Sequence, residues 1–456
     1  MLTTLAAPAF AGTWHIEDGD ITVKAGETKG TNKVSQGANQ EVEDTDTIIT
    51  NREAKASSNT VTIEAEKKDD KVEVTLKDVN IDTSSRNKAA VSVTGEGDTN
   101  IKLNGDNALK SDIYRSGIYG SGSLTISGGE NDSLTAQGGA GGSGIHISRN
   151  GSLTISGGTV NAKGGSGNIS GGDGICSDSG DVTISGGTVT ATGGGSTGSN
   201  GFGGRGIRSS SGGVTISGGT VTANGGNSTN SSGGYGISSL DVAISSGTVT
   251  ANGGDSKDGY GGDGIHSNDI DLSGSLELTA KAGSPNGKAL SQNGRELDLD
   301  TIKDKLGPGA KVTATDANGE TKQVSIPRPV EPEEPVIPEE SSSSSGGGST
   351  APSAPAFSLP GLTVTDKDGQ HISYTSTQSG NTLTVCVGRL TASFRISLAA
   401  LRQLRAEGIE AITFQTILCS TTLSLDELLA MGGEDAEVVL THHIRSSTLT
   451  VGGKAV

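Results

Sequence analysis

The sequence predicts a mostly β protein whose main part is a three-sided parallel β-helix of about 28 to 32 residues per repeat. The first indication is a phrase of the form Thr-Ile-Ser-Gly-Gly that recurs along the middle of the chain. Its central isoleucines are Ile126, Ile155, Ile184, Ile216 and Ile244, so the successive gaps are 29, 29, 32 and 28 residues. A near-constant gap predicts one structural unit per repeat.

Two further phrases inside each repeat complete the prediction of three short strands per turn. They are Thr-Val-Thr-Ala-x-Gly-Gly, as in residues 188–194 and 220–226, and Gly-Ile-x-Ser, as in 174–177 and 236–239. Alternation predicts that one side of these strands fills a narrow interior with small apolar residues. In one repeat these are Val182, Ile184, Val189, Ala191 and Ile207, and in the next Val214, Ile216, Val221, Ala223 and Ile237.

Glycine pairs separate the predicted strands, and we expect them to supply the positive φ angles of sharp corners. Less regular strands are predicted upstream, where they would form the first turns and a polar cap. Downstream, residues 276–280 look like the last turn, and 297–324 would close that end. The upstream strands are 59–63, 72–76, 90–93 and 100–103. A β-propeller is disfavoured, because its blades need antiparallel strands joined by tight hairpins.

Changes of composition divide the chain into four segments. Residues 1–11 read as a partial signal peptide that ends in Ala9-Phe10-Ala11, and 12–325 form the β-helix. Residues 326–360 are rich first in Pro and Glu and then in Ser and Gly, which is typical of a linker. Residues 361–456 alternate strand patterns with two helical stretches, around 398–407 and 423–431, and predict a small α+β domain.

The charge and hydropathy of the chain limit its partners. The net charge of −18 argues against nucleic acid, because phosphate binding relies on basic patches. No apolar run approaches the roughly 20 residues of a membrane span. With the signal-like start, this indicates an extracellular or cell-surface bacterial protein. The three cysteines, Cys176, Cys386 and Cys419, lack any metal-binding spacing along the sequence.

Stacked turns would align one residue per turn into columns, and two such columns are the candidate ligand-binding face. The two columns are His146, Cys176, Arg208, Ser238 and His266, directly after each Gly-Ile, and Ser143, Asp173, Arg205, Tyr235 and Asp263, two positions before each isoleucine. Arginine matches carboxylates and tyrosine stacks on sugar rings, so the binding candidates are Asp173, Arg205, Arg208, Tyr235, Asp263 and His266. A solvated face without a ligand is the alternative interpretation.

Two other chemistries remain open for these columns. Structural Ca²⁺ is expected in the Gly-rich turns, with Asp173 and Asp263 as oxygen ligands. A polysaccharide lyase would need a base such as Arg205 or Arg208 beside carboxylates that hold Ca²⁺. The predicted separation of one to three turns, about 5 to 15 Å, is too loose to define a catalytic site, so no catalytic residue is assigned.

The phrase Thr-Ile-Ser-Gly-Gly-Thr-Val-Thr-Ala, with Trp14-His15-Ile16-Glu17-Asp18-Gly19-Asp20, resembles a family of clostridial secreted proteins with carbohydrate-binding domains and a pectate-lyase-like β-helix. This resemblance implies that the three-sided parallel β-helix is right-handed. The resemblance covers roughly residues 12–325 and implies binding of a plant-type polysaccharide, such as cellulose or polygalacturonate, with structural calcium. No position matches a distinctive functional motif of that family, so no residue role is transferred. The sequence therefore favours a non-catalytic polysaccharide-binding protein; a lyase on the same fold and a structural stalk or adhesin are the alternatives.

Overall fold

The chain forms two compact units, residues 1–334 and 335–456, which are described separately. The computed structural model describes residues 11–149, 151–327, 362–365, 372, 374–379, 381–387, 391–416, 420–431, 436–442, 447–452 and 454–455. The predicted signal peptide, 1–11, therefore lies outside the described residues apart from Ala11. The predicted linker, 326–360, lies outside them from residue 328 onward.

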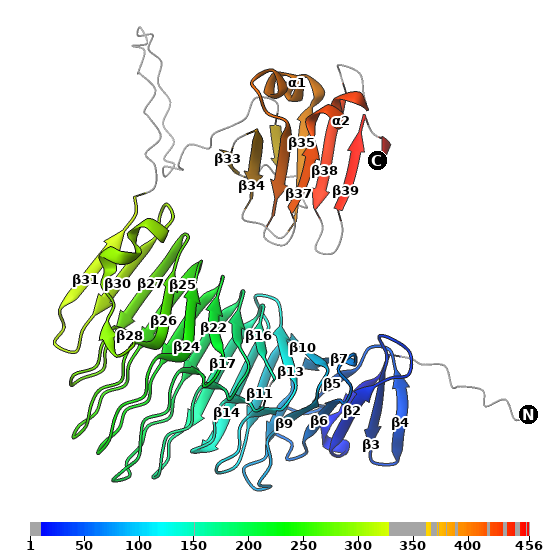
Figure 1. The fold of residues 1–456 in the computed structure, drawn as a ribbon. Coiled ribbons are helices and arrows are strands. Elements are labelled where there is room, and N and C mark those ends of the chain that lie inside the picture. The colour runs from blue at the N-terminus through cyan, green and yellow to red at the C-terminus, as the bar shows by residue number, and fades with distance from the viewer. Residues whose placement is uncertain are drawn as a thin grey trace, which may run out of the picture. The chain divides into compact units, whose positions relative to one another are not determined.

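The first unit is a β-solenoid of about 11 turns, which confirms the predicted parallel β-helix (Figure 1). Each central turn contributes three strands, and each strand pairs in parallel with its equivalents in the turns before and after. The resulting ladders are named here after their sequence phrases. The Gly-Ile ladder contains β12 (Ile118–Gly120), β15 (Ile145–Ile147), β18 (Ile175–Ser177) and β21 (Ile207–Ser209). The Thr-Ile ladder contains β13 (Ser123–Ser127), β16 (Leu153–Ile155), β19 (Val182–Ile184) and β22 (Gly213–Ile216).

The Val-Thr-Ala ladder forms a separate ten-stranded sheet along the solenoid. Its parallel strands are β8 (Asn80–Asp82), β11 (Asp106–Lys110), β14 (Ser133–Ala140), β17 (Thr159–Gly165), β20 (Thr188–Thr192), β23 (Thr220–Asn224), β25 (Gly247–Asn252), β27 (Leu276–Lys281) and β30 (Lys311–Thr315). In two of the later turns the Gly-Ile and Thr-Ile strands merge into single longer strands, β24 (Ile237–Ile244) and β26 (Ile265–Leu272).

The interior of the solenoid is filled as the alternation predicts. Val182, Ile184, Val189, Ala191 and Ile207 are all completely buried, and so are their five equivalents in the next turn. Each of these residues stacks on a similar one, as Ile184 does on Ile216. Burial of branched side chains combines with continuous backbone ladders, so a chain with few aromatic residues still forms a core.

The first turns contain the four predicted upstream strands, at 61–65, 71–77, 91–95 and 98–104, and three further strands that the sequence did not predict. They are β1 (Thr13–His15), β2 (Ile21–Ala25), β5 (Ile48–Thr50), β6 (Val61–Ala65), β7 (Lys71–Lys77), β9 (Val91–Gly95) and β10 (Asp98–Asn104). Two antiparallel strands, β3 (Asn32–Gln36) and β4 (Asn39–Asp44), continue from β2 and cap this end. The antiparallel pairing of these strands ends the series of parallel strands at this end of the solenoid.

At the opposite end the solenoid is one turn longer than predicted, because 276–280 is not the last turn. β28 (Leu290–Gln292) pairs in parallel with β26, and β30 pairs with β27. The antiparallel strands β29 (Arg295–Glu296) and β31 (Thr321–Ser325), with the 3-10 helix η2 (Leu299–Lys305), then close this end. The sequence of this last turn departs from the repeated phrases, so the repeat period did not predict it.

The glycines between strands have two different roles, only one of which was predicted. Gly187 and Gly219, at the corner after the Thr-Ile ladder, have φ of 80°, as expected of sharp turns. Gly141 and Gly158 also have positive φ, but the pairs after the Val-Thr-Ala ladder, such as 193–194 and 225–226, and those before the Gly-Ile ladder, such as 203–204 and 233–234, do not, so the prediction was wrong for them. A Cβ on Gly204 would lie 1.9 Å from the carbonyl oxygen of Gly172, so these glycines are required by close backbone approach.

The second unit is an α+β arrangement, as predicted. One sheet contains β32 (Leu362–Thr365), β35 (Ala392–Ser397), β38 (Glu437–His442), β39 (Ser447–Val451) and β40 (Lys454–Ala455), and the other contains β33 (Thr375–Ser379), β34 (Thr382–Cys386), β36 (Ala411–Gln415) and β37 (Ser420–Ser424). The helices α1 (Leu398–Ala406) and α2 (Leu425–Ala430) fall where the sequence indicated. Within the described residues, no helix has the length and apolar character needed to cross a membrane.

Candidate functional site

The two predicted columns are in register on the Gly-Ile ladder. His146, Cys176 and Arg208 pair across successive turns, and Ser238 and His266 continue the series. Backbone hydrogen bonds connect the neighbouring column in the same way; the amide of Gly174, for example, donates to the carbonyl of Arg205. Parallel pairing thus brings together side chains that are about 30 residues apart in sequence.

Arg208 and Asp173 form an ion pair between adjacent turns. Nε of Arg208 donates to Oδ2 of Asp173 at 2.7 Å, and the backbone amide of Arg205 donates to Oδ1 at 2.7 Å. The second arm of Arg208 donates to the sulfur of Cys176. Burial opposes the charge on Arg208, but Asp173 and Cys176 outweigh it and raise the pKa of this guanidinium. Arg208 is therefore a fixed cation.

Tyr235, Asp263 and His266 form a second group two turns further along. The rings of Tyr235 and His266 are stacked, with centroids 4.4 Å apart. Asp263 accepts from Nδ1 of His266 at 2.7 Å and from the backbone amide of Lys288 at 2.8 Å. Burial, followed by the nearby Asp263 carboxylate, raises the pKa of the Tyr235 hydroxyl. The structure thus joins three of the predicted residues in one contact group.

Asp173 and Asp263, the predicted calcium ligands, belong to these two separate groups and are three turns apart in their column. Each carboxylate already accepts hydrogen bonds on both of its oxygens. A Ca²⁺ ion at either residue would have to displace these donors. Calcium at Asp173 or Asp263 stays a prediction.

A groove runs along the Gly-Ile ladder over the first of the two groups. It consists of two adjoining parts of about 480 and 420 Å³, which share Tyr114, Ser116 and His146 in their walls. One part extends toward Thr62 on β6, and the other toward Arg208 on β21. Five steps between neighbouring strands separate these ends, which corresponds to about 24 Å at the usual strand spacing.

Aromatic side chains that were not among the candidates line this groove. Tyr119 precedes His146 in the column and is 39% exposed; its ring meets the His146 ring edge to face at 5.5 Å. Tyr114 and Phe202, on the loops before β12 and β21, are 62% and 56% exposed. Tyr119 was missed because its strand reads Gly-Ile-Tyr-Gly in place of Gly-Ile-x-Ser, although Gly117-Ile118 marks the turn.

A second cation, Arg205, lies at the same end of the groove as Arg208. Its side chain lines the groove, and its guanidinium carbon lies 5.7 Å from the centroid of the Tyr235 ring. Nε of Arg205 is buried without a hydrogen-bond partner among the described residues. In contrast to Arg208, which is paired with Asp173, Arg205 has no ion-pair partner among the described residues, so a guanidinium that lines the groove is available to a ligand.

Comparison with known proteins agrees with the fold. A family model described as "Beta helix repeat" matches residues 153–173, 182–204, 214–239 and 242–269, which lie in the most regular turns. The search of curated proteins and the search of solved structures found no match. The family match supports a pectate-lyase-like parallel β-helix and assigns no role to individual residues.

Proposed function

We propose that the chain is a non-catalytic polysaccharide-binding protein of the cell surface or extracellular space, and that the groove on the Gly-Ile ladder takes the polysaccharide. The observation that carries this proposal is a groove that extends over several turns with exposed aromatic rings and an uncommitted arginine along it. A long, open groove suits an extended chain better than a small metabolite, which needs an enclosing pocket.

Stacking of aromatic side chains on sugar rings is the first interaction by which the groove recognises a polysaccharide. Tyr114, Tyr119 and Phe202 expose ring faces or edges at the groove, where they contact the apolar faces of sugar rings. The ladders fix the backbone under Tyr119, so little conformational entropy is lost when a ligand binds. Aromatic rings alone would suit neutral glycans such as cellulose equally well.

Positive charge in the groove is the second interaction with the polysaccharide, and it favours an acidic glycan. The guanidinium of Arg205 has unused donors, and planar guanidinium groups match carboxylates. Arg115 also lines the groove near Tyr119, and so does Lys88, whose ammonium group pairs with Asp20 at 3.4 Å. Since the protein as a whole is acidic, with a net charge of −18, cations gathered in one groove indicate a local preference for anions. Polygalacturonate is therefore the better candidate than cellulose.

The ion pair that keeps Arg208 protonated argues against a polysaccharide lyase on the same fold. A lyase base must lose its proton, whereas the ion pair with Asp173 raises the pKa of Arg208. A stalk or adhesin without glycan affinity would not require Arg205 to remain unpaired beside aromatic rings. The groove thus favours the binding protein among the three functions.

The test is binding of the full chain to polygalacturonate and to cellulose, by affinity electrophoresis and pull-down, with calcium and with chelator. We expect polygalacturonate to bind in a salt-sensitive manner, because its carboxylates meet Arg205. Tyr119→Ala should weaken binding about tenfold through lost stacking. Arg205→Gln should remove the preference for the acidic glycan.

Matched controls lie on the Val-Thr-Ala ladder, outside the groove. Lys163→Gln removes an exposed cation, and Thr220→Ala truncates an exposed side chain; both should bind as the wild type does. Release of unsaturated uronate ends, followed by ultraviolet absorbance, would establish the lyase instead. Absence of binding to both glycans would leave the stalk or adhesin. Loss of binding in chelator that added Ca²⁺, but not Zn²⁺, restores would support the predicted calcium.

A further inference from the structure

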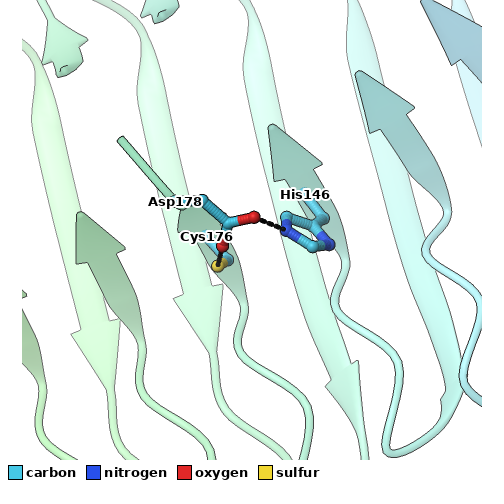
Figure 2. Close-up of side chains that lie close together, drawn as sticks. All are labelled: His146, Cys176 and Asp178. Atoms are coloured by element: carbon cyan, nitrogen blue, oxygen red, sulfur yellow. Dashed lines mark hydrogen bonds and ion pairs between the residues drawn. The ribbon is translucent and has the colours of Figure 1, made fainter. Parts of the chain in front are cut away.

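Three potential metal ligands meet on adjacent turns beside the groove, although they share no motif in the sequence. His146 lies on β15 and Cys176 on β18, where the two residues are paired in register, and Asp178 directly follows β18 (Figure 2). Nε2 of His146 lies 3.2 Å from Oδ2 of Asp178, and the Cys176 sulfur lies 3.9 Å from Oδ1. One ligand atom from each residue lies within 4.8 Å of the other two.

An imidazole nitrogen, a thiolate sulfur and a carboxylate oxygen are the donors that Zn²⁺ uses in proteins. At usual zinc bond lengths, ligand atoms at tetrahedral angles are about 3.3 to 3.6 Å apart. The His146–Asp178 separation is already close to this value, and the other pairs need side-chain shifts of about 1 Å. Hard cations such as Ca²⁺ prefer oxygen ligands alone, so this donor set selects a softer ion.

We propose that His146, Cys176 and Asp178 bind one Zn²⁺ ion, with the fourth coordination position directed toward the groove. Both His146 and Cys176 are part of the groove wall, so a ligand in the groove would have access to that position. The side chains of His146 and Asp178 are 27% and 44% exposed, which leaves an entry route for the ion. Neither Tyr119 nor Arg205 is a ligand of this site, although the Tyr119 ring meets the His146 ring.

The surroundings suit a bound cation of charge two. Without a metal, the Asp173 carboxylate pairs with the Arg208 guanidinium, whereas the Asp178 carboxylate contacts the Cys176 thiol and the His146 ring. A thiolate at Cys176 would add a third negative charge, and Zn²⁺ would bring the group to neutrality. Arg208 donates to the Cys176 sulfur at 2.9 Å, which is the kind of outer hydrogen bond that supports a metal-bound thiolate. Tyr119 packs against the His146 ring and restricts its orientation.

The experiment titrates Zn²⁺ alone, without glycan, into the full-length chain after chelator treatment. Calorimetry should give one ion per chain at this site. Co²⁺ in place of Zn²⁺ should give a thiolate-to-cobalt absorption band in the near ultraviolet. Cys176→Ser and His146→Gln should each weaken Zn²⁺ binding by more than about 100-fold, because loss of even an outer-shell partner costs 10- to 100-fold.

Matched controls separate this site from other thiols and imidazoles. Cys386→Ser removes a cysteine of the second unit, and His266→Gln removes another histidine of the same column, which contacts Asp263. Both should retain the ion and the cobalt band. Unchanged affinity in His146→Gln, or a cobalt band that survives Cys176→Ser, would overturn the proposal. If buried Cys176→Ser does not fold by circular dichroism, the half-exposed His146→Gln decides, and neither outcome depends on glycan binding.

Discussion

The guanidinium of Arg208 bonds the carboxylate of Asp173 across one turn of the solenoid, at 2.7 Å between Nε and Oδ2. The Asp173 side chain is only 8% exposed, so its charge depends on this partner and on the Arg205 amide. Removing one member of a buried pair leaves an uncompensated charge, which destabilises more than removing both. The pair therefore acts as a bond between turns.

Arg208→Met should lower the free energy of unfolding by about 2 kcal/mol, below the range for fully buried pairs because Arg208 is partly exposed. The double variant Asp173→Asn/Arg208→Met should recover part of this loss. Denaturant unfolding followed by circular dichroism measures both. Equal stability of the single and double variants would show that the Asp173 charge does not depend on Arg208.

The second prediction concerns the close backbone contacts at the glycine pairs. The amide of Gly204 donates to the carbonyl of Gly194, and a Cβ on Gly204 would lie 1.9 Å from the carbonyl oxygen of Gly172. Gly204→Ala must push two backbone segments apart, so we expect a loss of about 3 kcal/mol, the upper end for overpacking. The matched control is Gly213→Ala, whose Cβ would lie 3.4 Å from its nearest neighbour. A Gly204→Ala variant as stable as Gly213→Ala would contradict the close approach.

The repeat period and the alternation predicted the solenoid because both are local and recur. Ile155, Ile184 and Ile216 identify successive turns, and the register of the columns at Cys176 and Arg208 follows from them. The role of glycines such as Gly204 was not predictable, because it depends on how two segments of neighbouring turns approach each other. A sequence period alone does not specify that distance.

The sequence also could not predict which side chains within the columns pair with one another. Stacking places Asp173 near several candidates, but rotamers decide that Arg208 is its partner and that Arg205 is left free. The column already placed His146 beside Cys176, but Asp178 lies outside every repeated phrase, so its position beside them had no signal in the spacing of residues. Only the assembled turns show these contacts.

We expect Asp20, in the first turns, to make the stability of the protein depend on pH. Burial opposes its charge, but hydrogen bonds from Arg86 and from the Thr60 amide outweigh this and lower the pKa of Asp20 below 3.8. Its stabilising contribution is therefore complete above the ordinary carboxyl pKa and is lost as pH falls through the lower folded value. Asp20→Asn should cost about 1 kcal/mol at neutral pH, as for a well-formed exposed ion pair.

Thermal melts of wild type and Asp20→Asn at several pH values measure this effect. The difference between their melting temperatures should disappear in acid, where Asp20 is protonated in both states. Asp70→Asn is the matched control, since the Asp70 carboxylate accepts only from the nearby Lys67 amide. A difference that persists unchanged in acid would exclude the ion pair with Arg86 as its cause.

Cys176 and Cys386 should differ in reactivity, because Cys176 is buried in the groove wall beside Arg208 and Asp178, whereas Cys386 is partly exposed. Burial, followed by the Asp173 charge, raises the pKa of Cys176 to about 12, and its side chain is 1% exposed. In metal-free protein carrying Cys419→Ser, iodoacetamide at about pH 8.5, the ordinary cysteine pKa, should alkylate Cys386 and leave Cys176 unmodified. Peptide mass spectrometry locates the label, and denatured protein, in which both thiols should react, is the control. Rapid labelling of Cys176 in the folded protein would mean that the thiol is open to solvent, and the enclosed position between Arg208 and Asp178 would then be wrong.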